Sequence, residues 1–156
     1  MTIIAARTQA DVEAVRDLFR AYAASLPFSL DYQDFAAELA GLPGPYAAPG
    51  GCLLLAGGAD AAIGVVALRR FGEGIGEIKR LYVVPQARGL GLGRKLLSRA
   101  IDEARIRSYR CVRLDSHRAS MGAAIALYRQ LGFAETAPFG PDLGGRIAFF
   151  EKRLQE

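Results

Sequence analysis

The apolar residues of this chain fall into two spacing patterns, one typical of strands and one typical of helices. Short runs rich in aliphatic and β-branched residues predict strands at residues 2–6, 52–56, 63–71, 78–84, 111–114, 133–137 and 146–152. Apolar residues at helical spacing predict helices that begin after Thr8, at residue 32, near residue 92 and at residue 120. The chain is therefore expected to belong to the mixed α/β class.

The connections between these elements predict the order of the sheet. Tight Gly-rich turns follow residues 56 and 71, so the three strands from residue 52 to residue 84 are expected to form an antiparallel meander. The strand at 111–114 is reached through a helix, which predicts that it runs parallel to the strand at 78–84. The Pro- and Gly-rich segment 42–51 is predicted to be a surface loop, whereas residues 32–42 are predicted to be one helix.

The start of the first helix and the length of the chain add two predictions, one about the bounds of that helix and one about the number of domains. Thr8, with Asp11 three residues later, is close to a capping box, and the helix should end before Pro27. The 156 residues are enough for one sizeable core and few for two. We therefore expect a single domain over residues 1–156, with a mixed, largely antiparallel central sheet flanked by helices.

The stretch from Gly76 to Arg94 combines a buried strand with an anion-binding turn. Pro85 ends the strand because it cannot donate a ladder hydrogen bond. In the run RGLGLGR, from Arg88 to Arg94, glycine at every second position allows a tight turn that exposes successive N–H groups. A helix begins near Leu92, so these groups lie at its N-terminus, where a phosphate or pyrophosphate is the favoured ligand.

Composition and charge exclude several classes of protein. Hydrophobic residues make up 51% and charged residues 23%, which is typical of a globular chain. No segment approaches the roughly 18 apolar residues of a membrane span, so a cytoplasmic protein without membrane contact is expected. The net charge of +4 is spread along the chain, which gives no indication of nucleic-acid binding. Cys52 and Cys111 lack metal-ligand spacing and are predicted to be reduced thiols, and no metal is expected.

Two other phosphate-binding motifs fit the glycine run less well. A P-loop would require Lys followed by Ser or Thr, whereas Gly93 is followed by Arg94, Lys95 and Leu96. A dinucleotide-binding fold would place an acidic residue near the position of Asp115, at the end of the next strand. The third glycine of that motif is out of place, however, and Pro85 to Arg88 intervene between strand and turn.

Taken together, these motifs resemble the GNAT superfamily of acyl-CoA-dependent N-acyltransferases. The family signature, Arg or Gln, two residues, Gly, one residue and then Gly or Ala, is matched by Arg88, Gly91 and Gly93. The segments EIKRLYVVPQARGLGLGRKLL and AAIALYRQLGF are also typical of the family, and the order of predicted elements fits its fold over essentially the whole chain. The resemblance implies a GNAT fold and acetyl-CoA as co-substrate.

The resemblance also implies roles for individual residues. The pyrophosphate of acetyl-CoA would bind the loop, and the pantetheine arm would bind the backbone of the central strand. The implied coenzyme-binding residues are Leu81, Tyr82, Val83, Arg88, Gly89, Leu90, Gly91, Leu92, Gly93 and Arg94. Glu77 would act as the base that deprotonates the amine, directly or through water, and Tyr128 would protonate the departing thiolate. Each has a structural alternative: Glu77 as an ion-pair partner of Lys79, Arg80 or another cation, and Tyr128 as a core aromatic residue.

Three further residues near this region are weaker candidates: Ser120, His117 and Asp115. Met121 stands where many members of the family have an asparagine that binds pantetheine, and Ser120 is the neighbouring polar replacement. His117, the only histidine, is predicted to lie on a loop, where a solvated side chain is the commoner role. Asp115, at a strand end, is likewise a weak candidate for a residue that contacts the acceptor.

The function implied by the resemblance is transfer of an acetyl group to a primary amine within a ternary complex. No acyl-enzyme is expected, because neither cysteine lies near the motif with a histidine to activate it. The acceptor is open: a small metabolite, an antibiotic-like amine, a peptide N-terminus or a protein lysine. A non-catalytic acetyl-CoA sensor is the alternative. The oligomeric state is also open, with a homodimer as one form that the family adopts.

Overall fold

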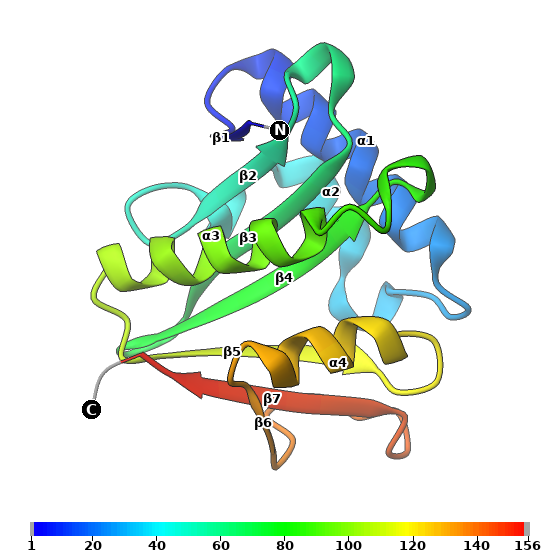
Figure 1. Ribbon diagram of the computed structural model, residues 1–156, viewed down its shortest axis with the longest axis vertical. Coiled ribbons are helices and arrows are strands. Elements are labelled where there is room, and N and C mark those ends of the chain that lie inside the picture. Colours follow the sequence, from blue (N-terminus) through cyan, green and yellow to red (C-terminus); the bar gives the residue numbers. More distant parts are fainter. Residues whose placement is uncertain (1, 155–156) are drawn as a thin grey trace.

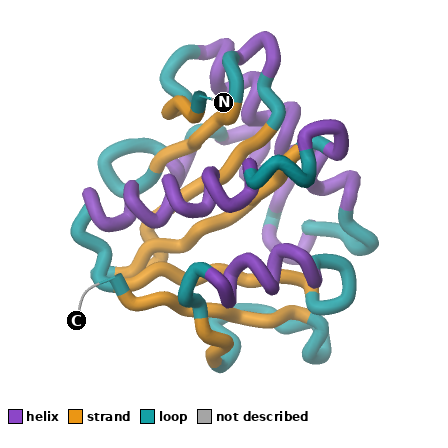
Figure 2. The backbone as a smooth tube through the Cα atoms, in the orientation of Figure 1, coloured by secondary structure: helices purple, strands orange, loops and turns teal. Residues whose placement is uncertain are grey.

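The structure is a computed structural model that describes residues 2–154, and it is built on one seven-stranded sheet (Figures 1 and 2). The strands are β1 (Ile3–Ala5), β2 (Cys52–Ala56), β3 (Gly64–Gly72), β4 (Ile75–Val83), β5 (Cys111–His117), β6 (Ala134–Thr136) and β7 (Ile147–Arg153). The α-helices are α1 (Gln9–Ser25), α2 (Phe35–Gly41), α3 (Leu92–Ile106) and α4 (Gly122–Gln130). Short 3₁₀ turns are η1 (Asp31–Gln33), η2 (Gly44–Tyr46), η3 (Ala59–Ala61) and η4 (Pro85–Ala87).

The sheet is mixed, as the sequence predicted, with the strand order β1-β2-β3-β4-β5-β7-β6. Every neighbouring pair is antiparallel except β4 and β5, which are parallel. Helices α1 and α2 cover one face, and α3 and α4 cover the other (Figure 1). In residues 2–154 there is no helix long and apolar enough to cross a membrane.

Local sequence signals account for the two long helices. Thr8 and Asp11 form a full capping box, in which each side chain accepts a hydrogen bond from the other residue's backbone N–H. All six apolar positions at helical spacing in α3 are buried against the sheet: Leu92, Leu96, Leu97, Ala100, Ile101 and Ala104. The predicted α1 and α3 are confirmed.

Three predictions need correction because non-local packing overrides the local pattern. The helix predicted at 32–42 is interrupted at Asp34, whose φ of 55° ends η1 before α2 begins. The predicted surface loop 42–51 buries Tyr46, whose ring packs edge-on against Phe19 at 6.1 Å. The strand predicted at 111–114 continues to His117, because β7 pairs with it up to the register of His117 and Ile147. Both cysteines are free thiols, Cys52 buried and Cys111 half-buried.

The separation of the two parallel strands creates the space for a site. β4 and β5 are paired only from Ile75 to Glu77 on the β4 side, and beyond that point they diverge (Figures 1 and 2). β4 also contains a bulge: Ala67 is paired with Lys79 and Val65 with Tyr82, so Val66 alone opposes two residues. The diverging half of β4 therefore has a free edge and an irregular backbone.

Candidate active site

The loop between β4 and α3 has the conformation of an anion-binding turn. Gly89 and Gly91 have φ angles of 83° and 77°, a region that side-chain-bearing residues adopt only with strain. A Cβ atom at either glycine would meet nothing within 4 Å, so the space in front of the loop is open. Glycine is therefore required here for backbone conformation, and its missing side chain leaves room for a ligand.

The N–H groups of this loop are available to a ligand. None of the hydrogen bonds formed among residues 2–154 uses the backbone N–H groups of Gly89 to Arg94. Gly91 is the N-cap of α3 and supplies no side-chain cap. A series of free donors at a helix N-terminus, with the positive end of the helix dipole behind it, favours a phosphate group. The pyrophosphate site at Arg88 to Arg94 stays a prediction, which these free donors support.

Arg88 does not point toward this loop. Its Nε donates to the carbonyl oxygen of Val83 at 2.9 Å, and its guanidinium lies 5.6 Å from the centre of the Tyr82 ring. Leu81, Tyr82, Val83 and Arg88 line one cavity of about 310 Å³ along the free edge of β4. Because Arg88 already binds the carbonyl of Val83, a pantetheine arm that bound this carbonyl would have to displace the Arg88 side chain.

Residues at the start of α4 form the opposite wall of the same cavity. The Sδ of Met121 accepts a hydrogen bond from the hydroxyl of Ser116 at 2.9 Å. The hydroxyl of Ser120 is 2.7 Å from Nδ1 of His117, whose ring nitrogen also accepts the Ser120 N–H. Ser120, the predicted replacement for the missing asparagine, therefore lines the cavity with its hydroxyl bound to His117.

A second, narrow cavity of about 40 Å³ lies between β4 and β5 where they diverge. It shares Leu81 and Met121 with the larger cavity, so the two adjoin. Its polar lining comes from both strands and from helices on both faces of the sheet: Tyr22, Lys79, Arg80, Asp115 and Tyr128. Side chains from the two faces of the sheet meet here because the strands are no longer paired.

Tyr128 enters this cavity from α4. Its ring is buried and packs against Phe133 and Phe150, with ring centres 6.0 and 5.8 Å away. Burial raises the pKa of the Tyr128 phenol, an effect that hydrogen bonding to Ser116 opposes. The phenol is therefore protonated at neutral pH and is a hydrogen-bond donor within the cavity. Tyr128 is both a core aromatic residue and a lining residue of this cavity, and its role as proton donor to the thiolate stays a prediction.

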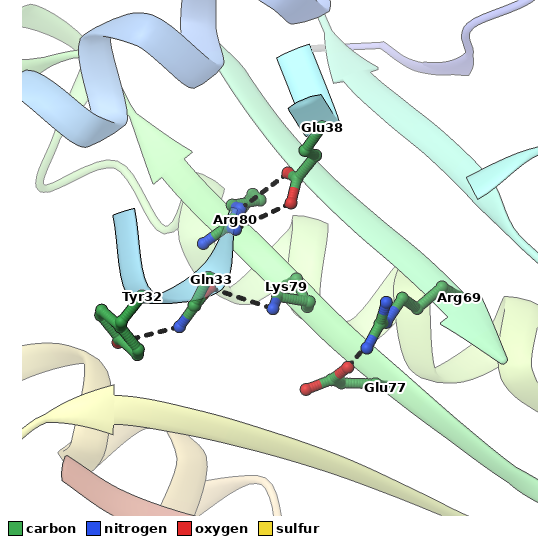
Figure 3. Close-up of polar contacts among 7 residues, drawn as sticks. All are labelled: Tyr32, Gln33, Glu38, Arg69, Glu77, Lys79 and Arg80. Carbon is green, nitrogen blue, oxygen red and sulfur yellow. Dashed lines mark hydrogen bonds and ion pairs between the residues drawn. The ribbon is translucent and has the colours of Figure 1, made fainter. Parts of the chain in front are cut away.

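Glu77 is buried and paired with a cation, although not with either residue named from the sequence. Its Oε1 accepts a hydrogen bond from Nε of Arg69 on β3 at 2.8 Å. Figure 3 shows the other carboxylate oxygen pointing away from Arg69. Lys79 instead donates to Oε1 of Gln33 at 3.1 Å. Glu77 is absent from the lining of the narrow cavity and can reach a ligand only through Oε2.

The bulge in β4 is held by an ion pair that sequence reasoning missed. Arg80 has a φ of 62° and is buried, and its Nε and Nη2 donate to the two carboxylate oxygens of Glu38 at 2.9 and 2.8 Å (Figure 3). Its guanidinium also lies over the rings of Phe35 and Tyr22. Glu38 is 42 residues away in the sequence, so no local signal could have identified this contact.

Alternate residues of β5 face the α1 and α2 side of the sheet. Val112 and Leu114 belong to the core beneath α3 and α4, so Arg113, Asp115 and His117 point to the opposite face. The His117 ring lies 4.7 Å from the Phe28 ring. His117 and Phe28 also line a third cavity of about 430 Å³, together with Pro27, Arg118, Ala119, Leu143 and Arg146.

Comparison with known families shows to which protein family this chain belongs. The family model described as the acetyltransferase (GNAT) family matches residues 12–133, which include the glycine loop, the diverging strands and Tyr128. The chain belongs to the GNAT family. The GNAT fold predicted from the sequence is confirmed, and the members of this family are acyltransferases.

Individual relatives support the same assignment. An uncharacterized N-acetyltransferase of Schizosaccharomyces pombe is 33% identical over 141 residues, 89% of this chain and 86% of that protein. IAA acetyltransferase of Azospirillum brasilense is 47% identical over 68 residues, and this match spans only 44% of each protein. The structure of yncA from Salmonella typhimurium with its cofactor acetyl-CoA superimposes with a TM-score of 0.70 at 27% identity, covering 100% of this chain and 95% of that one.

Proposed function

We propose that this protein is an N-acetyltransferase that transfers the acetyl group of acetyl-CoA directly to a primary amine within a ternary complex. The observation that carries the proposal is the continuity of the site. The cavity along β4 is lined by Arg88, which directly precedes the free N–H groups of the glycine loop, and it adjoins the narrow cavity that Tyr128 lines. A ligand that begins with a pyrophosphate and ends with a thioester has this order of parts.

The two ends of the coenzyme have different requirements, and the proposed site supplies both. The loop from Gly89 to Arg94 offers free backbone donors, which suit phosphate oxygens. The unpaired edge of β4 at Leu81 to Val83 offers peptide groups, which suit the amides of pantetheine. The thioester would then reach the cavity between β4 and β5, where water is largely excluded and positioned dipoles act strongly.

The proposed chemistry needs a positioned amine and two proton transfers. The amine nitrogen attacks the thioester carbonyl carbon, the C–S bond breaks, and the thiolate leaves with a proton from Tyr128. Glu77, the base that the resemblance implies, could act only through Oε2, because Oε1 is bound to Arg69. Neither cysteine lines any of the three cavities, which supports direct attack over an acyl-enzyme.

The acceptor is proposed to enter from the α1 and α2 face. On this face the cavity beside His117 is lined by apolar and aromatic residues together with Arg118 and Arg146. Related proteins are named for quite different acceptors: an L-methionine sulfone in Salmonella typhimurium and an alanine of ribosomal protein S18 in Escherichia coli. Both small amino acids and protein N-termini are therefore acceptor classes to test here.

The test is a thiol-release assay with acetyl-CoA and a panel of amines. The panel contains L-methionine sulfone, free L-amino acids, spermidine, an aminoglycoside, an alanine-initiated peptide and a lysine peptide. We expect release of free thiol with at least one of them, together with a product heavier by one acetyl group in the mass spectrum. Binding of acetyl-CoA without thiol release on any amine would contradict the proposed activity and favour a non-catalytic sensor.

A further inference from the structure

The cavity between β4 and β5 is lined by one carboxylate, that of Asp115. Asp115 extends from β5 toward the α1 and α2 face, the side of the proposed acceptor. Tyr128 reaches the same cavity from the opposite face of the sheet. A group bound between these two side chains would have a carboxylate on the acceptor side and a phenol on the coenzyme side.

The carboxylate of Asp115 has no partner within the described chain. It takes part in none of the hydrogen bonds or ion pairs formed among residues 2–154, whereas Glu77 is bound by Arg69 and Glu38 by Arg80. The same residues contain no fully enclosed side-chain oxygen or nitrogen that lacks a hydrogen bond. The oxygens of Asp115 are therefore open to the cavity. A carboxylate that is half-buried and still unpaired is costly to keep, unless a ligand supplies its partner.

Its surroundings suit a proton acceptor. Burial raises the pKa of the Asp115 carboxyl, and the negative charge of Glu77 adds to this effect, while Lys79, Arg80 and Arg69 oppose it. Burial lowers the pKa of an ammonium group that enters the same cavity. The two pKa values therefore approach one another, which makes proton transfer between them easier than in water. Two neighbouring carboxylates, one held by an arginine and one unpaired, are thus prepared for different roles.

We propose that Asp115, and not Glu77, binds the ammonium group of the acceptor and takes its proton. This inference rests on the proposed function and names the residue that prepares the amine for attack. The acceptor would be a primary amine that is cationic in solution and enters from the α1 and α2 face. Glu77 then keeps Arg69 in place and contributes negative charge without binding the amine.

The protons balance in this scheme. The ammonium gives one proton to Asp115 and becomes the neutral amine that attacks the thioester carbon. The C–S bond breaks, and the second proton lost from nitrogen restores the proton that Tyr128 gives to the thiolate. Asp115 finally releases its proton to water. The products are the N-acetyl amine, free coenzyme A and one proton.

The experiment compares Asp115→Asn, Glu77→Gln and Asp102→Asn with the wild type, with the amine that releases the most thiol in the panel. We expect Asp115→Asn to lower kcat/KM at neutral pH by about 10²-fold or more, with unchanged affinity for acetyl-CoA. Glu77→Gln should lower it by less than about 10-fold, because Oε2 makes no contact with the amine. Asp102, on the exposed side of α3, serves as a control and should have no effect.

The pH profile separates proton transfer from a purely structural role. The loss in Asp115→Asn should shrink as the pH rises toward the pKa of the amine, because the substrate then arrives neutral. The charged and titratable groups around Asp115 are unchanged in this variant: Tyr22, Tyr32, Arg69, Glu77, Lys79, Arg80, Arg113, His117 and Tyr128.

Three outcomes would overturn the inference. A larger loss in Glu77→Gln than in Asp115→Asn would return the base to Glu77. A loss in Asp115→Asn that is the same at every pH would reduce Asp115 to a structural residue. If the wild type binds acetyl-CoA but acetylates no amine in the panel, the role of Asp115 falls and the coenzyme site stands. If acetyl-CoA does not bind at all, the proposed function itself fails.

Discussion

Arg80 and Glu38 form a buried, bidentate ion pair that joins the bulge of β4 to α2, with donor–acceptor distances of 2.9 and 2.8 Å. The side chain of Arg80 is 2% exposed and that of Glu38 is 12% exposed. Each of these buried charges needs its partner, because a charge left alone at this position could not regain its hydration by water. This pair fixes the backbone beside the cavity in which acetyl transfer is proposed.

Replacement of Glu38 by Gln should therefore destabilise the fold strongly. It leaves the Arg80 guanidinium buried without a counter-charge, which costs about 3–5 kcal/mol of the free energy of unfolding. Urea denaturation followed by circular dichroism measures the change. Asp17→Asn is the matched control, since Asp17 pairs with Arg20 on the exposed face of α1 and its loss should cost less than about 1 kcal/mol. A similar small loss for Glu38→Gln would show that the buried pair is dispensable.

The glycine loop can be tested by one substitution. Gly91→Val should weaken acetyl-CoA binding by at least about 10²-fold, because a β-branched residue is strained at a φ of 77° and its side chain would occupy the open space before the N–H groups. Isothermal titration of acetyl-CoA measures the affinity. Gly58→Ala is the control, since Gly58 has a φ of −79° and open space around it. Unchanged affinity in a folded Gly91→Val variant would exclude this loop as the pyrophosphate site.

The phenol of Tyr128 is predicted to act in the leaving-group step. Tyr128→Phe keeps the aromatic packing against Phe133 and Phe150 and removes the proton donor, so kcat should fall by about 10²-fold while acetyl-CoA affinity stays the same. Tyr109→Phe is the control: its hydroxyl donates to the Gly50 carbonyl, so its loss should cost about 1 kcal/mol of stability and leave kcat unchanged. An unchanged kcat in Tyr128→Phe would mean that another group or water protonates the thiolate.

The charged carboxylate of Asp115 should lower the stability of the folded protein at neutral pH. Because its pKa is raised in the folded state, its protonated form favours folding below the unfolded-state value of 3.8, and this contribution is lost as the pH rises through the folded-state pKa. Asp115→Asn should therefore melt at a higher temperature than the wild type at neutral pH, and the difference should shrink in acid. Calorimetry at several pH values measures this. A lower melting temperature at neutral pH would show that Lys79 already compensates the charge.

The sequence was sufficient for those parts of the site that local chain geometry determines. Alternating glycines before a helix permit a turn with positive φ angles, so the loop at Gly89 and Gly91 was predictable. Tyr128 was found only through the resemblance, since its spacing on a helix is equally typical of a core residue. The capping box at Thr8 was predictable for the same local reason as the loop.

The remaining parts depend on contacts between distant segments. Glu77 meets Arg69 because of the register of β3 and β4, and Arg80 meets Glu38 through a bulge that places Lys79 and Arg80 on the same face. His117 lies in a strand because β7 pairs with it. The cavity at Asp115 exists because β4 and β5 stop pairing after Glu77. No periodicity in the chain encodes these registers.

The most direct test of the account is isothermal titration of the wild-type protein with acetyl-CoA. The central claim is that the free N–H groups after β4 and the unpaired edge of β4 form one coenzyme site. We predict saturable binding of one acetyl-CoA per chain, and competition by coenzyme A, which has the same pyrophosphate and pantetheine. The absence of binding to folded protein would contradict the coenzyme site and the acetyl transfer proposed from it.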